Sequence, residues 1–285
     1  MSKISTTAAM IDSYTNTAIK NYVKSHDEST YFPKEIWDEL TNEMDIFLPI
    51  LSEENHTLSS DFITFIRKIA NEFAALSAIL LTQGCYGIYS ILNFGTAEQK
   101  ELYLEKLLKG QYIAGLGFCE YKHLKGLEDL ETYATKTEQG WCLSGKKAMI
   151  SNSSVADILL VLAKVKEQGK VEKYGLFIVD PKDSDVLIGE QIEKPGLIGL
   201  PLSSVTLKNV LLPENALLGD ELAGDVQFAN IIKNMQLGLS AIALGVAEGA
   251  FNKGIEFAKV KRGFGKRLID VEIHQNKFAD LYNKL

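Results

Sequence analysis

The spacing of apolar residues changes twice along this 285-residue chain. Up to about residue 110, apolar residues recur every three or four positions, as at Ile36, Trp37 and Leu40, which is typical of helices. Short runs rich in β-branched and aromatic residues follow, and the helical spacing returns after Gly219. This order predicts an α+β fold with three parts: an N-terminal helical domain (1–110), a middle β domain (111–213) and the start of a C-terminal helical domain (214–285).

The middle region contains five runs that predict strands. They lie at residues 112–119, 131–137, 156–165, 174–180 and 204–210. Gln139 and Gly140 join two of these runs, as expected of turn residues. Several short strands at this spacing favour a compact sandwich or barrel.

Two helical segments have further local signals. Thr96 and Gln99 have the spacing of a capping box, which predicts that a helix begins at about residue 97. In the last third, an apolar stripe predicts a long core helix: Phe228, Ile232, Met235, Leu239, Ile242 and Val246. The same helix contains Gly238, Gly245 and Gly249, whose small size would let another helix approach closely.

Composition excludes some classes of function. With 30 basic and 37 acidic residues the net charge is -7, which argues against a general nucleic-acid surface. The most apolar stretch, residues 73–92, is interrupted by polar and glycine residues, so we expect a buried helix and no membrane span. The three cysteines lack CxxC spacing and residues 1–17 lack a signal-peptide pattern. A reduced, cytoplasmic protein is therefore expected.

Five short motifs occur in a fixed order. Residues 94–100 read FGTAEQK, residues 144–152 read SGKKAMISN, and residues 209–219 read NVLLPENALLG. Residues 245–250 read GVAEGA, and residues 264–266 read FGK. Each motif alone is weak, but in this order and spacing the set resembles the acyl-CoA dehydrogenase family.

The resemblance implies an FAD-dependent enzyme that removes two hydrogens from the α and β carbons of an acyl thioester. In that family a carboxylate takes the α proton and the β hydrogen leaves as a hydride to the flavin. Hydrogen bonds to the thioester carbonyl stabilise the charge that develops on its oxygen. The acyl carrier would be coenzyme A or an acyl carrier protein. Homo- or hetero-oligomers would form through the C-terminal helices.

The resemblance also assigns cofactor-binding positions in the β domain. Phe118, Cys119 and Glu120 match the flavin-facing segment of the family, with Cys119 in place of a threonine. Ser151 stands where the family has a hydroxyl near flavin N5. Met149 replaces a tryptophan that shields the ring, so the cover remains apolar and polarizable.

The last part of the chain departs further from the family. Lys261 matches an arginine that contacts the FAD pyrophosphate of a neighbouring subunit, Arg262 is adjacent, and Phe264 is retained. Glu272 places a carboxylate where a phosphate-bearing cofactor is expected. We therefore expect FAD binding to be weak or to depend on a partner.

No catalytic base is identified in this chain. A minority of the family has its base at the position of Met235, and a neighbouring substrate-binding arginine is Gln236 here. These two residues are retained as substrate-binding candidates. In most of the family the base would lie beyond residue 285, so the C-terminal helical domain is expected to be incomplete.

Three interpretations follow. The chain could be a subunit or fragment of an acyl-CoA dehydrogenase-like flavoenzyme whose base comes from a missing segment or a partner. It could instead be a catalytically inactive paralogue that keeps the fold for assembly, or a flavin-dependent oxidase or monooxygenase on the same scaffold.

Overall fold

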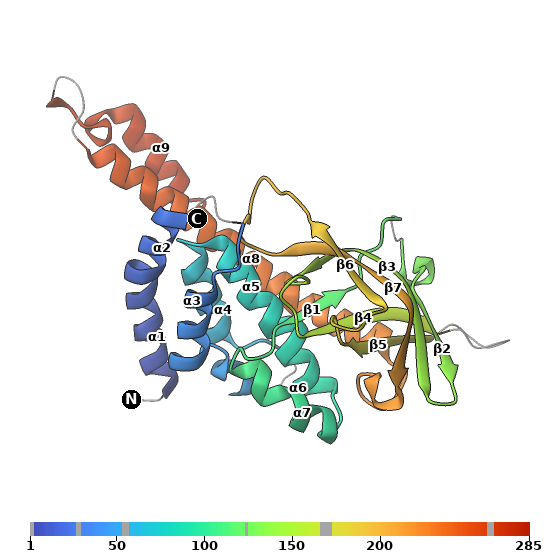
Figure 1. Ribbon diagram of the computed structural model, residues 1–285. Helices are drawn as coiled ribbons and strands as arrows, with labels where there is room; N and C mark the ends of the chain where they lie inside the picture. The colour runs from blue at the N-terminus through green and yellow to red at the C-terminus, as the bar shows by residue number, and fades with distance from the viewer. Residues whose placement is uncertain (1–2, 27–29, 53–56, 123–124, 166–172, 261–264) are drawn as a thin grey trace.

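The computed structural model describes residues 3–26, 30–52, 57–122, 125–165, 173–260 and 265–285. Helices α1 to α7 form one side of the molecule, strands β1 to β7 form the other, and the long helix α8 passes along both (Figure 1). This is the α+β architecture predicted from the periodicity, with helices before the sheet and after it.

The N-terminal helices enclose a core of large aromatic and aliphatic side chains. Trp37, Phe47 and Phe62 are fully buried. The Phe47 ring packs against Trp37 on one side and against Phe62 on the other. The helices are α1 (Lys3–Tyr14), α2 (Lys20–His26), α3 (Lys34–Asp38), α4 (Ser60–Ala70), α5 (Ala74–Thr82), α6 (Ser90–Phe94) and α7 (Ala97–Leu108). A π-helical segment, η4 (Gln83–Tyr89), joins α5 to α6.

The seven strands form one mixed, curled sheet. Its order is β1-β4-β2-β3-β7-β6, and β5 also pairs with β4. The pairs β1–β4 and β2–β4 are parallel, and the other pairs are antiparallel. The strands are β1 (Ala114–Gly117), β2 (Tyr133–Thr137), β3 (Gly140–Ser151), β4 (Ile158–Val165), β5 (Lys173–Val179), β6 (Val186–Gln191) and β7 (Leu202–Pro213).

The strand predictions were right in part. All five predicted runs contain a strand. Gln139 lies in the turn of the β2–β3 hairpin and Gly140 begins β3, so this turn leads from one predicted run into a strand that was not predicted. Strands β3 and β6 were not among the predicted runs. β3 contains two consecutive lysines and a bulge at Gly145, and β6 is an edge strand with exposed polar residues, so neither has the expected apolar alternation.

Two buried glutamines connect the helices to the sheet. The capping box is confirmed, because Thr96 Oγ1 accepts from Gln99 N at 3.2 Å and Thr96 N donates to Gln99 Oε1 at 3.0 Å. The Gln99 side chain also donates to the Asn215 and Leu217 carbonyls after β7. Gln83 donates to the Leu107 and Tyr112 carbonyls and accepts from Ala114 N at 2.8 Å, which fixes the start of β1.

The apolar segment from Ala74 to Phe94 has the length and composition of a membrane span, and no other helix among the described residues does. Within this fold 94% of its most apolar window is buried. The segment forms α5, η4 and α6, which are helices of the core. Gln83, which interrupts the segment, has all of its amide groups satisfied by the contacts to α7 and β1.

Helix α8 (Gly224–Lys259) packs against α4 and α5 through its small residues, as predicted. A Cβ atom added at Gly245 would lie 2.2 Å from the Arg67 carbonyl oxygen, and one at Gly249 would lie 2.0 Å from the Asn71 carbonyl oxygen. The predicted apolar stripe was wrong at two positions: Leu239 is 50% exposed and Val246 is 44% exposed. The glycines take the buried face, so these larger residues turn outward. Helix α9 (Glu272–Tyr282) then packs its Phe278 ring against Phe251 of α8.

Gly249→Ala should lower the free energy of unfolding by about 1–3 kcal/mol, because the added methyl group overlaps the backbone of the neighbouring helix. Urea denaturation followed by circular dichroism measures this change.

Gly254→Ala on the same helix is the matched control. Its Cβ would make an ordinary 3.5 Å contact with Phe278, so helix propensity should raise stability by about 0.5–1 kcal/mol. Equal effects of the two substitutions would contradict the close approach of α8 to α4.

Candidate functional site

Two segments that are distant in sequence lie side by side at one end of the sheet. Ala148 N of β3 donates to the Cys119 carbonyl oxygen at 2.9 Å. Gly115 and Gly117 of β1 make this approach possible, since a Cβ at either position would fall within 3 Å of β3 atoms. Residues 118–120 and 147–151, called the paired segments below, contain all five of the cofactor-binding residues predicted in the β domain.

A buried ion pair joins the paired segments. Lys147 Nζ lies 2.7 Å from Glu120 Oε1, and the two side chains are 0% and 2% exposed. Glu120 also accepts from Glu131 N at 2.7 Å and from Thr132 N at 3.1 Å. Its carboxylate is therefore bonded inside the protein. A cofactor could contact Glu120 through the backbone of that residue.

The electrostatics follow from burial and pairing. Burial lowers the pKa of Lys147 to about 8, although the Glu120 carboxylate opposes this shift. Burial alone would raise the pKa of Glu120, but the Lys147 ammonium and the hydrogen bonds to the carboxylate keep it below its ordinary value. Burial raises the pKa of the Cys119 thiol, which stays protonated near neutral pH.

Met149 and Ser151 present their side chains at the surface of β3. A bulge between Lys147 and Ile150 changes the register, and beyond it Ile150 is fully buried while Met149 is 48% exposed. Ser151 is partly buried. Its hydroxyl makes no hydrogen bond with any residue that the structure describes. This pair offers an apolar thioether and an unpartnered hydroxyl on the same side of the strand.

One cavity, called the aromatic cavity, opens beside Cys119. Its volume is about 430 Å³. Phe118 contacts Phe228 of α8 across it, with ring centroids 5.1 Å apart. Leu127, Leu130 and Leu162 make the rest of its interior apolar, and two lysines are at its edge: Lys122 and Lys125.

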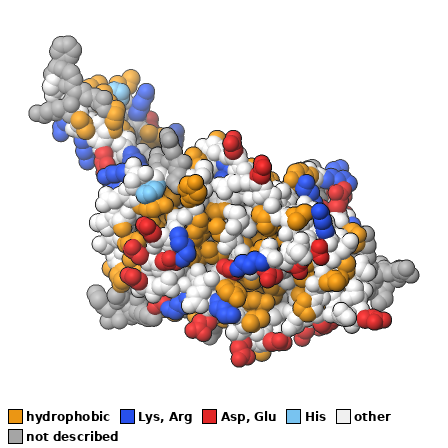
Figure 2. Space-filling model, in the orientation of Figure 1, with side chains coloured by type: hydrophobic (Ala, Val, Ile, Leu, Met, Phe, Trp, Pro, Cys, Tyr) orange, Lys and Arg blue, Asp and Glu red, His pale blue; other side chains and the backbone are white. Residues whose placement is uncertain are grey.

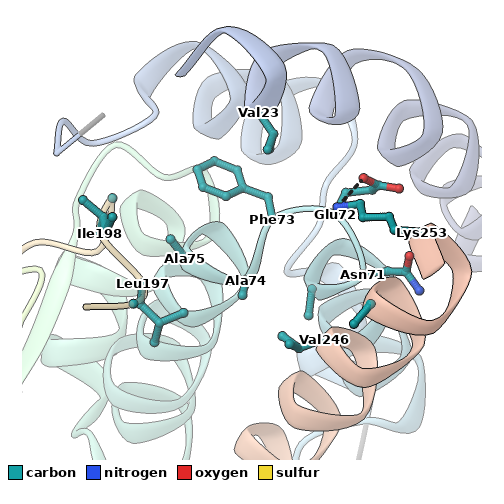
Figure 3. Close-up of a pocket in the computed structure, with 14 residues that line it drawn as sticks. Val23, Asn71, Glu72, Phe73, Ala74, Ala75, Leu197, Ile198, Val246 and Lys253 are labelled. Carbon is teal, nitrogen blue, oxygen red and sulfur yellow. Dashed lines mark ion pairs between the residues drawn. The ribbon is translucent and has the colours of Figure 1, made fainter. Parts of the chain in front are cut away.

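A second cavity, called the interhelical cavity, has a volume of about 400 Å³. Figure 3 shows apolar side chains arranged around it and an ion pair at its edge, where Lys253 Nζ lies 3.3 Å from Glu72 Oε2. Its loop 196–199 leads into β7, where Leu202 pairs with Ser151. The apolar residues are Val23, Ala70, Phe73, Ala74, Ala75, Leu197, Ile198, Val246 and Ala250.

Helix α8 contains the two predicted substrate-binding residues. Met235 is 7% exposed and belongs to the apolar core, whereas Gln236 is exposed. Both are two helical turns, about 10 Å, beyond Phe228. Neither lines the aromatic or the interhelical cavity, so the structure does not bring them to the paired segments.

Three predicted cofactor-binding residues, Lys261, Arg262 and Phe264, lie outside the described residues. Sequence reasoning also missed residues that shape the site, namely Lys147, Phe228 and Leu162. For Lys147 a signal existed, because a lysine inside an apolar β segment requires a buried counter-charge. Which carboxylate supplies that charge could not be predicted from the sequence.

Comparison with known proteins agrees with this geometry. Residues 4–111 match the acyl-CoA dehydrogenase N-terminal domain, and residues 115–210 match the acyl-CoA dehydrogenase middle domain. Together the two matches cover most of the chain. The protein therefore belongs to the acyl-CoA dehydrogenase family.

Individual relatives are distant. The 3-(aryl)acrylate reductase of Clostridium sporogenes is 25% identical over 261 residues, which are 91% of this chain and 69% of that protein. Butyryl-CoA dehydrogenase from Megasphaera elsdenii has a TM-score of 0.87 and 24% identity over 99% of this chain and 76% of its own. A glutaryl-CoA dehydrogenase from Mycobacterium smegmatis in complex with FADH2 has a TM-score of 0.84 and 22% identity, covering 98% of this chain and 71% of its own. At these identities the structural likeness shows a shared fold.

Lys147→Met alone should lower the free energy of unfolding by about 3–5 kcal/mol, because it leaves the Glu120 carboxylate buried without its partner. The double variant Glu120→Gln/Lys147→Met should recover most of that loss. Chemical denaturation of wild type, both single variants and the double variant completes the cycle. Additive effects would contradict a direct pair.

The buried lysine also predicts a dependence of stability on pH. Because the pKa of Lys147 is about 8 in the folded chain and 10.5 ordinarily, the unfolded chain binds more protons at this group between those values. The free energy of unfolding of wild type should therefore rise relative to the double variant from pH 8 to 10.5, by on the order of 1–3 kcal/mol. A difference that stays constant or falls would contradict the burial of a charged lysine.

Proposed function

We propose that this chain forms part of an FAD-dependent enzyme that removes hydrogen from the α and β carbons of an acyl thioester, as a subunit or segment of a larger assembly. The observation that supports this most directly is the pairing of residues 118–120 with residues 147–151, which leaves Ser151 and Met149 accessible on one side of β3. Family membership supports the reaction class, and the FADH2 complex of the Mycobacterium smegmatis relative supports the cofactor.

The residues at the paired segments fit the ring half of a flavin. The Ser151 hydroxyl has no partner among the described residues and can hydrogen-bond a ring nitrogen. The exposed Met149 thioether can cover an aromatic face. Residues 118–121 lie beyond the last β1–β4 pair, Gly117 with Val161, and the Cys119 carbonyl is bonded to Ala148 N of β3.

When bound there, FAD would accept the hydride that leaves the β carbon. The chain itself would bind the acyl group, exclude water from it and orient it against the strand end. The interhelical cavity is apolar enough for an acyl chain and is connected through the 196–199 loop to the strand end that contains Ser151. The acyl carrier would be coenzyme A or an acyl carrier protein.

The proton acceptor would come from outside the described residues. Of the carboxylates lining the two cavities, Glu120 is paired with Lys147 and Glu72 with Lys253. Neither is free to take a proton from substrate. The same geometry would serve the reverse direction, reduction of a carbon–carbon double bond, which is the direction named for the Clostridium sporogenes relative.

A second candidate function is that of a non-catalytic partner subunit. The buried Met235 thioether and the two paired carboxylates favour it, because a chain kept for assembly needs no base. In either case the C-terminal helices suit oligomerisation. The C-terminal part of α8 and α9 project from the body (Figure 1), and hydrophobic side chains are visible on this projection (Figure 2). Phe257, Ile273 and Leu281 are among the exposed apolar residues of the two helices.

Ser151→Ala should weaken FAD binding about three- to tenfold, because it removes one hydrogen bond, worth about 0.5–1.5 kcal/mol, from the ring. Titration of the purified protein with FAD, followed through the visible flavin absorption bands, measures the dissociation constant.

Ser154→Ala is the control, since Ser154 is exposed three residues further along the chain. It should leave the dissociation constant unchanged. If wild type and both variants bind FAD with the same affinity, Ser151 does not belong to the site. If wild type binds no FAD, either alone or with its partner, the proposed enzyme is contradicted.

A further inference from the structure

Strand β7 has one free edge along residues 210–213. Its neighbour β6 pairs with it between residues 203 and 207, and Lys208 N then donates to the Asp185 carbonyl oxygen at 2.9 Å. A bulge follows, with Asn209 at φ 55°. Beyond the bulge β7 pairs with β3 on one side, and no backbone group among the described residues bonds to its other side.

A free strand edge offers backbone groups to another chain. Residues of an antiparallel strand alternate in the direction of their N–H and C=O groups, so about half of the groups in residues 210–213 point away from β3. An extended segment of a second chain can pair with such groups and add a strand to the sheet.

The same residues form one wall of a groove, called the edge groove below. It has a volume of about 460 Å³ and lies between the end of β7 and helix α7. Leu211 of β7 and Leu102 of α7 line it and are 69% and 46% exposed, and Tyr103 and Tyr112 line it as well. Exposed apolar side chains gathered along a strand edge are typical of an interaction surface.

Carboxylates surround the apolar part of the edge groove. It is lined by Glu98, Asp157, Asp180 and Asp183, and by no lysine or arginine of the part of the chain that the structure describes. Asp157 forms an ion pair with Lys182 at 3.0 Å, and the other three carboxylates form no ion pair with a described residue. The groove therefore has a negative potential, which is complementary to a basic partner.

We propose that the edge groove binds an extended segment of a partner protein in which apolar residues alternate with lysine or arginine. The segment adds to the free edge of β7 through backbone hydrogen bonds, which fix its register. Because side chains alternate between the two faces of a strand, its apolar residues pack on Leu102 and Leu211 while its basic residues reach the carboxylates. The edge groove shares no residue with the paired segments, so this inference does not depend on the proposed function.

The test uses the purified protein and short fluorescein-labelled peptides, with fluorescence anisotropy to measure the dissociation constants. A peptide of alternating lysine and valine should bind, and its affinity should fall as the salt concentration rises, because salt screens exposed charges. A peptide of alternating glutamate and valine should not bind. Neither should a lysine–valine peptide with methylated backbone nitrogens, which cannot donate hydrogen bonds to β7.

Leu211→Lys should weaken binding of the lysine–valine peptide by about tenfold or more, because it removes an apolar contact and adds a like charge. Leu187→Lys is the matched control. Leu187 is a 42% exposed leucine on β6 that does not line the edge groove, so its dissociation constant should equal that of wild type.

The double variant Asp180→Asn/Asp183→Asn tests the charges. The asparagine oxygens can still accept from Lys182 N and Asp185 N, so the turn before β6 is retained. Binding should weaken and depend less on salt.

Four results would overturn the proposal: no binding of the lysine–valine peptide at low salt, equal binding of its methylated form, equal weakening by Leu211→Lys and Leu187→Lys, or no effect of the asparagine double variant. Light scattering of wild type and Leu211→Lys tests the remaining occupant. Self-association that Leu211→Lys abolishes would show that a second copy fills the groove, which also contradicts the proposed partner.

Discussion

A lysine and a glutamate with almost no contact with water, Lys147 and Glu120, determine the geometry of the candidate site. Their Nζ–Oε1 distance is 2.7 Å, and the carboxylate also accepts two backbone N–H groups. A buried pair of this kind contributes little net stability, since desolvation offsets the attraction between the charges. Its effect here is positional, because neither charge can move away without leaving the other unpaired. The residues after β1 are thereby held against β3.

Other buried polar groups extend this arrangement to the helices. Gln83 and Gln99 each satisfy several backbone groups at the boundary between the helical layer and the sheet. α8 then closes the interface, with its glycines against α4 and α5 and Phe228 against Phe118. The fold therefore supplies a frame around the paired segments, while α8 and α9 expose several apolar side chains among polar ones. Such a frame can hold a ring cofactor. The exposed surfaces of α8 and α9 can pack against helices of another segment or subunit.

The sequence predicted features that depend on near neighbours. The capping box at Thr96 and Gln99, the turn at Gln139 and Gly140, and the close packing of the α8 glycines all follow from residues a few positions apart. Features set by distant residues were not predictable. The partner of Lys147 is 27 residues away, and β3 was missed because its two lysines interrupt the apolar pattern that defines a strand.

The site shows the same limit. Phe118, Cys119, Glu120, Met149 and Ser151 were identified through the family motif, and the structure brings the two groups together. The motif did not show that the Glu120 carboxylate is bonded inside the protein, to the Lys147 ammonium and to two backbone N–H groups. Likewise, the apolar spacing of α8 could not distinguish its buried face from its exposed one, because glycines occupy the buried positions.

The most direct test of this account is a crystal structure of the protein grown with FAD and, if one is required, its partner chain. The account predicts that the flavin ring lies against Met149 with the Ser151 hydroxyl within hydrogen-bonding distance of a ring nitrogen, and that Lys147 and Glu120 remain paired behind it. A flavin bound elsewhere on the chain, or a ring that contacts neither Met149 nor Ser151, would contradict it.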